Sequence, residues 1–134
     1  MTHELVLWLM SENEISRVVV DCAFKIHNQY GAGLLESVYE RILSYELERA
    51  GLPLKRQIPI PVIHRDVHLD IGFRLDILVM EKVIIEIKSV EELTPLHSKQ
   101  LLTYLRLTNL QLGLLINFNV NLIKDGIRRV VNGL

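Results

Sequence analysis

The chain has 134 residues, of which 49% are hydrophobic and 23% charged, and its formal net charge is −1. A chain of this length buries roughly 70% of its unfolded surface, so we expect one domain over residues 1–134, with residues 1–13 as an N-terminal extension. The charge balance excludes a protein that is basic overall, so any surface for nucleic acid must be local.

The first predicted element is an amphipathic helix after Ser11. Ser11 and Glu14 have the spacing of a capping box, and apolar residues recur at helical intervals from Ile15 to Ile26. We expect this helix to end near Tyr30, because Gly31-Ala32-Gly33 supplies a permissive C-cap and a turn. His27 lies on the same helix and is expected to be a structural histidine.

A second helix is predicted from about Leu34 to Ala50, and Gly51 and Pro53 end it. Glu36 shares a helical stripe with Tyr39, Leu43 and Leu47. This stripe predicts that the Glu36 side chain points toward the protein interior.

Three β-strands are predicted next, at residues 57–63, 69–79 and 83–90. Pro59 and Pro61 cannot donate ladder hydrogen bonds, so they restrict the first strand to a sheet edge or to one non-bonded side. Polar residues 64–67 form the first turn and residues 80–82 the second, which predicts an antiparallel meander.

A third helix is predicted from Pro95 to about Leu107, with Thr94 as N-cap. The apolar run at residues 112–118 is typical of a buried strand that lies parallel to its neighbour after a helical crossover. Residues 126–131 add a short edge strand. The order ααβββαβ(β) indicates an α/β domain with a mixed central sheet flanked by helices.

Three charged residues interrupt the apolar strands of this meander, namely Asp76, Glu86 and Lys88. Alternation puts Glu86 and Lys88 on one strand face, with Ile85 and Ile87 on the other. Burying an ion among so many aliphatic side chains costs on the order of several kcal/mol unless the ion is paired or binds a metal. The pattern therefore indicates a divalent-metal site.

Asp76 with Glu86-Ile87-Lys88, set in a meander followed by a helix, resembles the PD-(D/E)xK nuclease superfamily and its restriction-endonuclease-like core. The segment Gly33-Leu34-Leu35-Glu36-Ser37-Val38-Tyr39 carries the Gly-x-x-Glu-x-x-Tyr signature of the small bacterial GxxExxY proteins, a branch of that superfamily. The resemblance extends from about Glu14 to the end of the chain.

The resemblance implies a nuclease that uses Mg²⁺ or Mn²⁺. Asp76 and Glu86 would bind the cation, the backbone carbonyl of Ile87 would add a ligand, and Lys88 would assist the attacking water. Two carboxylates suit Mg²⁺, which prefers oxygen ligands and keeps several waters. The implied reaction is hydrolysis of phosphodiester bonds in nucleic acid, with DNA as the expected substrate.

Glu36 has two interpretations. With Gly33 as N-cap, the Glu36 carboxylate would bond back to the cap amide and stabilise the helix. The resemblance instead implies that it is a catalytic acid and metal ligand, as first-helix acids are in related nucleases, and we favour this second role.

The third helix carries His97, Gln100 and Tyr104 on one face. Gln100 and Tyr104 resemble the Gln-x-x-x-Tyr motif of the exonuclease branch, which implies contacts with nucleic acid. The alternative is that Tyr104 packs in the core and Gln100 is solvated. His97 is predicted near the nucleic acid, but it also occupies a helix-capping position. Arg74, on the strand face of Asp76, could contact phosphate or form a surface ion pair.

Two further hypotheses compete with the nuclease. One is a catalytically silent nuclease fold that binds nucleic acid or protein, and the other is a structural ion pair between Lys88 and an acid. The single cysteine, Cys22, excludes an internal disulfide, and the segment around Trp8 has no basic leader, so we expect the cytoplasm and no membrane. The Trp8 segment and the proline-bearing edge strand are the surfaces expected for a homodimer.

Overall fold

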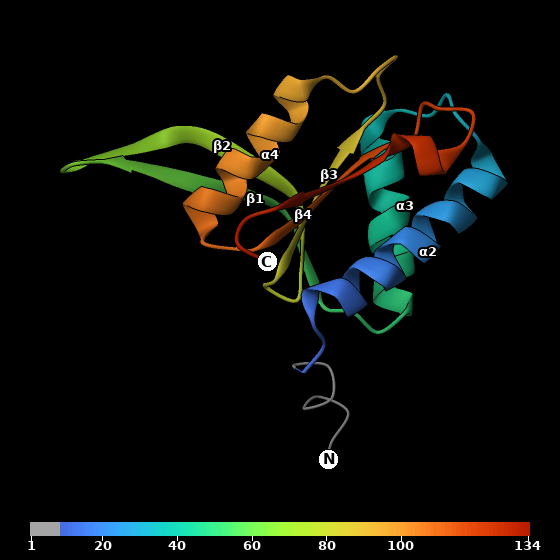
Figure 1. The fold of residues 1–134 in the computed structure, drawn as a ribbon, viewed down its shortest axis with the longest axis horizontal. Helices are drawn as coiled ribbons and strands as arrows, with labels where there is room; N and C mark the ends of the chain where they lie inside the picture. The colour runs from blue at the N-terminus through green and yellow to red at the C-terminus, as the bar shows by residue number, and fades with distance from the viewer. Residues whose placement is uncertain (1–8) are drawn as a thin grey trace.

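The structure is a computed structural model that describes residues 9–134, except for the side chains of Asp70 and Ile71. The segment around Trp8, predicted as a dimer surface, lies outside the described residues. Along the chain, two helices precede three strands, a third helix and two further strands (Figure 1). The predicted order ααβββαβ(β) is confirmed.

The helix boundaries follow the capping signals closely. Helix α2 spans Glu12–Tyr30; Glu14 donates its backbone N–H to Ser11 Oγ over 3.1 Å, and Gly31 is the C-cap. Helix α4 spans Pro95–Thr108 with Thr94 as N-cap, as predicted. Helix α3 spans Glu36–Arg49, and its N-cap is Leu35 rather than Gly33.

The sheet has five strands in the order β1-β2-β3-β4-β5. They span Leu54–His64, Val67–Val79, Val83–Lys88, Leu112–Asn117 and Ile127–Val131, and a short 3₁₀ helix, η1, at Ile123–Gly126 precedes the last. Strands β3 and β4 are parallel through the α4 crossover, and the other neighbours are antiparallel. The mixed sheet with an antiparallel meander is therefore confirmed.

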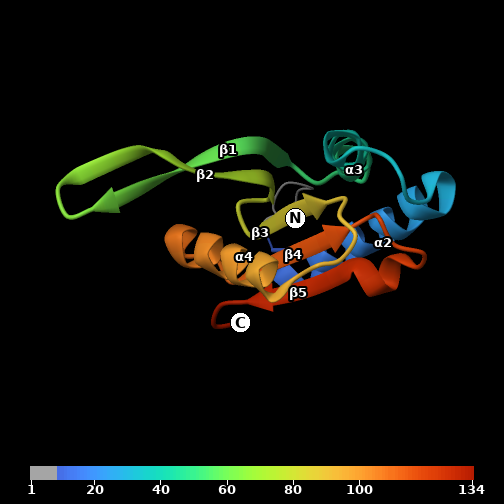
Figure 2. The same cartoon turned by 90° about the horizontal axis from the view of Figure 1, so that it is seen from above.

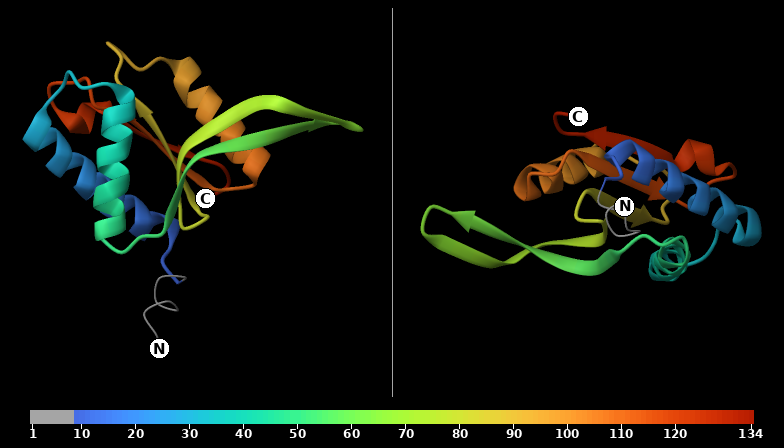
Figure 3. Two further views of the ribbon diagram at one scale, coloured as in Figure 1. Left: turned by 180° about the vertical axis from the view of Figure 1, so that it is seen from behind. Right: turned by 90° about the horizontal axis from the view of Figure 1, so that it is seen from below.

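Alternation along the central strands divides the core between the two faces of the sheet. Ile85 and Ile87 pack with apolar side chains of α2 and α3, and Ile84 packs with Leu101 and Leu105 of α4. Helices α2 and α3 therefore cover one face and α4 covers the other (Figures 2 and 3). Glu86 and Lys88 belong by alternation to the α4 face.

The outer parts of β1 and β2 form a hairpin that extends away from the body of the domain (Figures 1 and 2). Its turn lies at Arg65 and Asp66, within the predicted segment. Strand β1 is an edge strand, as Pro59 and Pro61 required. Toward the hairpin, β2 continues to pair with β1 but no longer pairs with β3 beyond Ile77, which is next to Asp76.

None of the helices in the described part of the chain is both long and apolar enough to cross a bilayer.

Candidate active site

Strands β2 and β3 separate at Asp76. Their ladder pairs only Ile77–Val79 with Val83–Ile85. Beyond it, the Asp76 N–H approaches Glu86 Oε1 at 3.4 Å, and Ile87 donates its N–H to Asp76 Oδ2 over 2.8 Å. Two carboxylates thus take the backbone hydrogen bonds that the diverging strands no longer exchange. We call this point the strand fork, defined by Asp76, Glu86 and Ile87.

Burial governs the electrostatics of the strand fork. Glu86 is only 7% exposed and Asp76 is half-buried. Burial, followed by the negative charge of Asp76, raises the pKa of Glu86 to about 9. The pKa of Asp76 is also raised, again first by burial. Each of these two acids therefore holds its proton more tightly than a solvated carboxyl does, and a cation bound between them would let both ionise.

Lys88 is the last residue of β3 and is half-buried. Its positive charge lowers the pKa of both Asp76 and Glu86, as the smallest of the effects on each. Within residues 9–134, no carboxylate lies within ion-pair distance of the Lys88 ammonium. The structural ion pair considered from the sequence is therefore not formed among the described residues.

Glu36 takes neither of its two predicted positions in full. The capping arrangement with Gly33 is absent, because Glu36 is the first helical residue after Leu35. The prediction that its side chain faces the interior is wrong, since Glu36 is exposed. Its Oε2 instead accepts the backbone N–H of Ser89 over 3.2 Å, next to Lys88.

A second acid of α3, Glu40, is not among the site residues predicted from the sequence. It is 5% exposed and forms an ion pair with Arg56 Nη2 at 2.6 Å, and its other oxygen accepts Gln57 Nε2 at 2.6 Å. Its charge raises the pKa of Asp76, so it lies close to the strand fork. Helical spacing could have revealed it, because Glu40 shares the buried i, i+3, i+4, i+7 pattern with Leu43, Ser44 and Leu47.

Helix α4 brings Tyr104 to the strand fork from the other face of the sheet. Burial, followed by the negative charges of Glu86 and Asp76, raises the pKa of Tyr104 to about 12. Its ring contacts Phe73 with a centroid separation of 5.2 Å. Gln100, one turn earlier, is exposed. Tyr104 thus packs in the core and Gln100 is exposed, as the second alternative predicted, and contact of the two with nucleic acid stays a prediction.

The remaining predicted residues are less directly connected to the strand fork. His97 Nδ1 accepts the Thr94 N–H over 3.0 Å, so the structure shows its capping role. Arg74 is exposed on β2, two residues before Asp76. His27 is buried with Nε2 2.8 Å from the Val120 carbonyl oxygen, which confirms a structural histidine. Contacts of His97 and Arg74 with nucleic acid stay predictions.

The residues of the strand fork suit a hard divalent cation. Mg²⁺ is commonly bound by one or two carboxylates and several water molecules. The buried Glu86 and half-buried Asp76 carboxylates supply two such ligands, and a cation between them would favour the ionised form of both. Within residues 9–134, no three Asp, Glu, His or Cys side chains gather closely enough to form a metal cluster. Asp76 and Glu86 are therefore the acids that the structure brings together, and Glu36 is not joined to them.

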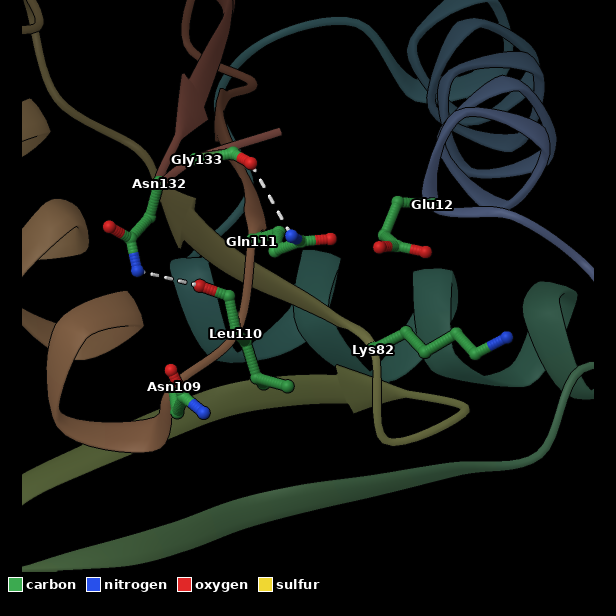
Figure 4. A pocket seen from close by; sticks show the side chains of 7 residues that line it. All are labelled: Glu12, Lys82, Asn109, Leu110, Gln111, Asn132 and Gly133. Carbon is green, nitrogen blue, oxygen red and sulfur yellow. Dashed lines mark hydrogen bonds between the residues drawn. The ribbon is translucent and has the colours of Figure 1, made fainter.

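Two hollows lie at opposite ends of β3. The one in Figure 4, of about 390 Å³, is lined by Glu12, Lys82, Asn109, Leu110, Gln111, Asn132 and Gly133. It lies at the start of β3, away from Lys88, and its amides bond to the backbone, as Asn132 does to the Leu110 carbonyl. The other, of about 620 Å³, includes Glu36 and Ser89. The second is the hollow next to the candidate site.

A family model described as the PD-(D/E)XK nuclease superfamily matches residues 13–130. No curated protein and no solved structure matches the chain at a significant level.

Proposed function

The chain belongs to the PD-(D/E)XK nuclease superfamily, and we propose that it is a Mg²⁺- or Mn²⁺-dependent nuclease that hydrolyses phosphodiester bonds in DNA. The observation that carries this proposal is the strand fork, where the buried Glu86 and half-buried Asp76 carboxylates lie together at the end of an apolar ladder, with Lys88 on the same strand as Glu86. A binding module has no evident use for acids placed where a phosphate would approach. We also propose the finer assignment to the GxxExxY branch.

Asp76, Glu86 and the carbonyl of Ile87 would hold the cation. When bound, the cation would polarise a phosphoryl oxygen and lower the pKa of a water molecule. Lys88 would stabilise negative charge that develops on the phosphate or orient the water. Tyr104 lies beside the acids from α4, and with the exposed Gln100 it would contact the polynucleotide.

Cleavage assays with matched variants test this function. Purified protein is incubated with single- and double-stranded DNA and RNA, in linear and circular form, with Mg²⁺ or Mn²⁺. We expect cleavage of DNA, its loss in Asp76→Ala and Lys88→Ala, and no change in Glu48→Gln, an exposed acid on the same helix as Glu36. Cleavage that survives both alanine variants would assign the activity to another site or to a contaminant.

Metal binding separates the enzyme from the silent fold. Calorimetry of the wild type should detect one Mn²⁺ per chain, and Glu86→Gln should weaken that binding at least tenfold. A wild type that binds no Mn²⁺ at millimolar concentration, and cleaves nothing, would favour a nuclease fold retained for binding alone.

We further propose a cytoplasmic homodimer, since Cys22 is a free buried thiol and a small nuclease must span a duplex. Light scattering measures the oligomeric state directly, and a monomer at assay concentration would rule out the dimer.

A further inference from the structure

We propose that the Gly33-x-x-Glu36-x-x-Tyr39 motif positions Lys88 through the backbone of Ser89, and that Glu36 is a positioning residue rather than a metal ligand. This inference rests on the proposed nuclease function. It assigns one mechanical role to all three residues of the motif.

The backbone just after β3 needs partners that the sheet does not supply. Strand β2 leaves β3 at Asp76, so residues beyond Ile87 have lost their antiparallel neighbour. On the other side, the ladder with β4 ends at the pair Lys88 and Asn117. The end of β3 carries Lys88, so the position of Lys88 depends on the groups that form hydrogen bonds with the peptide units after Ile87.

One set of partners comes from β4. Phe118 donates its N–H to the Lys88 carbonyl over 3.0 Å. The buried Asn117 side chain accepts the Val90 N–H at 3.1 Å and donates to the Val90 carbonyl at 2.9 Å. These bonds fix Lys88 and Val90, the residues directly before and after Ser89.

The other set comes from the start of α3. Glu36 Oε2 accepts the Ser89 N–H at 3.2 Å, and Ser89 Oγ donates to the Leu34 carbonyl at 2.9 Å. Glu36 thus occupies the place beside Ser89 that β2 has vacated.

Tyr39 fixes the loop from which these two partners come. Its fully buried ring stacks on Phe118 with centroids 4.4 Å apart. Its hydroxyl donates to the Gly31 carbonyl at 2.6 Å and accepts the Leu34 N–H at 3.1 Å. Gly33 has φ +109°, which residues with a side chain rarely adopt. The tight turn at Gly33 and the Tyr39 anchor therefore set where Leu34 and Glu36 meet Ser89.

The geometry of Glu36 does not join it to the acids of the strand fork. Its carboxylate is exposed and already accepts the Ser89 amide, and no metal cluster of three such side chains forms among residues 9–134. If Glu36 is a metal ligand, the Mn²⁺ affinity depends on the negative charge of its side chain. If Glu36 is a positioning residue, a neutral hydrogen-bond acceptor at position 36 is enough for cleavage.

The test compares Glu36→Ala, Glu36→Gln and Tyr39→Phe with the control Glu48→Gln. Exchange of the Ser89 amide proton is followed by NMR, Mn²⁺ affinity by calorimetry, and cleavage by initial rate. We expect Glu36→Ala and Tyr39→Phe to accelerate Ser89 exchange at least tenfold. Glu36→Ala should lower the cleavage rate at least tenfold while the Mn²⁺ affinity stays within twofold, and Glu36→Gln should restore the rate.

A loss of Mn²⁺ affinity of tenfold or more in both Glu36 variants would overturn the proposal, because it would make Glu36 a ligand. Unchanged Ser89 exchange in Glu36→Ala and Tyr39→Phe would also overturn it. If the wild type neither binds Mn²⁺ nor cleaves, the nuclease function fails. Accelerated Ser89 exchange in that case would still support the positioning of the Lys88 segment by the motif.

Discussion

Ile87 donates its backbone N–H to the carboxylate of Asp76 over 2.8 Å, where the ladder between β2 and β3 has ended. The Asp76 side chain thus replaces a neighbouring strand as the hydrogen-bond partner of Ile87. Asp76 is held in place by the same backbone that carries Glu86 and Lys88, so the spacing of the three groups follows from the way the sheet opens.

Substitutions of Asp76 should separate this structural bond from the charge. In Asp76→Ala the Ile87 N–H loses its acceptor in a half-buried place, which costs about 1–3 kcal/mol. Asp76→Asn keeps an acceptor and removes the repulsion with Glu86, so its stability should equal or exceed that of the wild type at pH 8. Urea denaturation measures both values. Cleavage should be lost in both variants, and an Asp76→Ala protein as stable as the wild type would contradict the structural role of this bond.

The raised pKa of Glu86 predicts a pH-dependent stability in the absence of metal. Its pKa is about 9 in the folded chain against an ordinary value of 4.5, so the folded state holds the proton more tightly. This contribution to stability is complete below about pH 4.5 and is lost as the pH rises toward 9. In EDTA, Tm should therefore fall between pH 5 and pH 8.5, and Glu86→Gln should flatten that slope.

Added Mn²⁺ competes with this proton, so it should raise Tm more at pH 8.5 than at pH 5. The Glu86→Gln variant is the control, because it keeps the other titrating groups. Equal slopes of Tm against pH in the wild type and in Glu86→Gln would contradict the assignment of this proton to Glu86 in the strand fork.

Much of this site could be predicted because acids in apolar strands are costly wherever they occur. Asp76 and Glu86 stand out in the sequence for that reason, and the structure brings them together. Glu36 shows where periodicity fails. The helical stripe with Tyr39 gives the direction of a side chain around the axis but not its position along it, and Glu36 lies at the first turn, where the helix is exposed.

The burial of Glu40 could be predicted from helical spacing, but its contacts with Arg56 and Gln57 could not, for a different reason. Their contacts join a helix to an edge strand, and Gln57, within that strand, has a positive φ of +51°. A positive φ at glutamine has no sequence signal comparable to a glycine.

The Glu40 and Arg56 pair should contribute to stability through its burial. Arg56→Met leaves a carboxylate that is 5% exposed without its cation, which costs up to about 3–5 kcal/mol for a fully buried pair and less here, because the Arg56 side chain is 29% exposed. We expect Glu40→Gln with Arg56→Met to recover part of that loss. Urea denaturation of the double-mutant cycle measures the coupling, and additive losses would contradict a direct pair.

Tyr104 offers a way to separate packing from a role at the active site. Tyr104→Phe keeps the ring and its contact with Phe73, so the free energy of unfolding should change by less than about 1 kcal/mol. Tyr104→Ala removes a buried aromatic ring and should cost about 3–5 kcal/mol. If the Tyr104 hydroxyl contacts the substrate, Tyr104→Phe should lower DNA cleavage several-fold at unchanged Tm. Tyr45→Phe, at an exposed position of α3, is the control and should change neither cleavage nor Tm. A fully active Tyr104→Phe protein would restrict Tyr104 to the core, and the contact with nucleic acid would then have to come from Gln100 or Arg74.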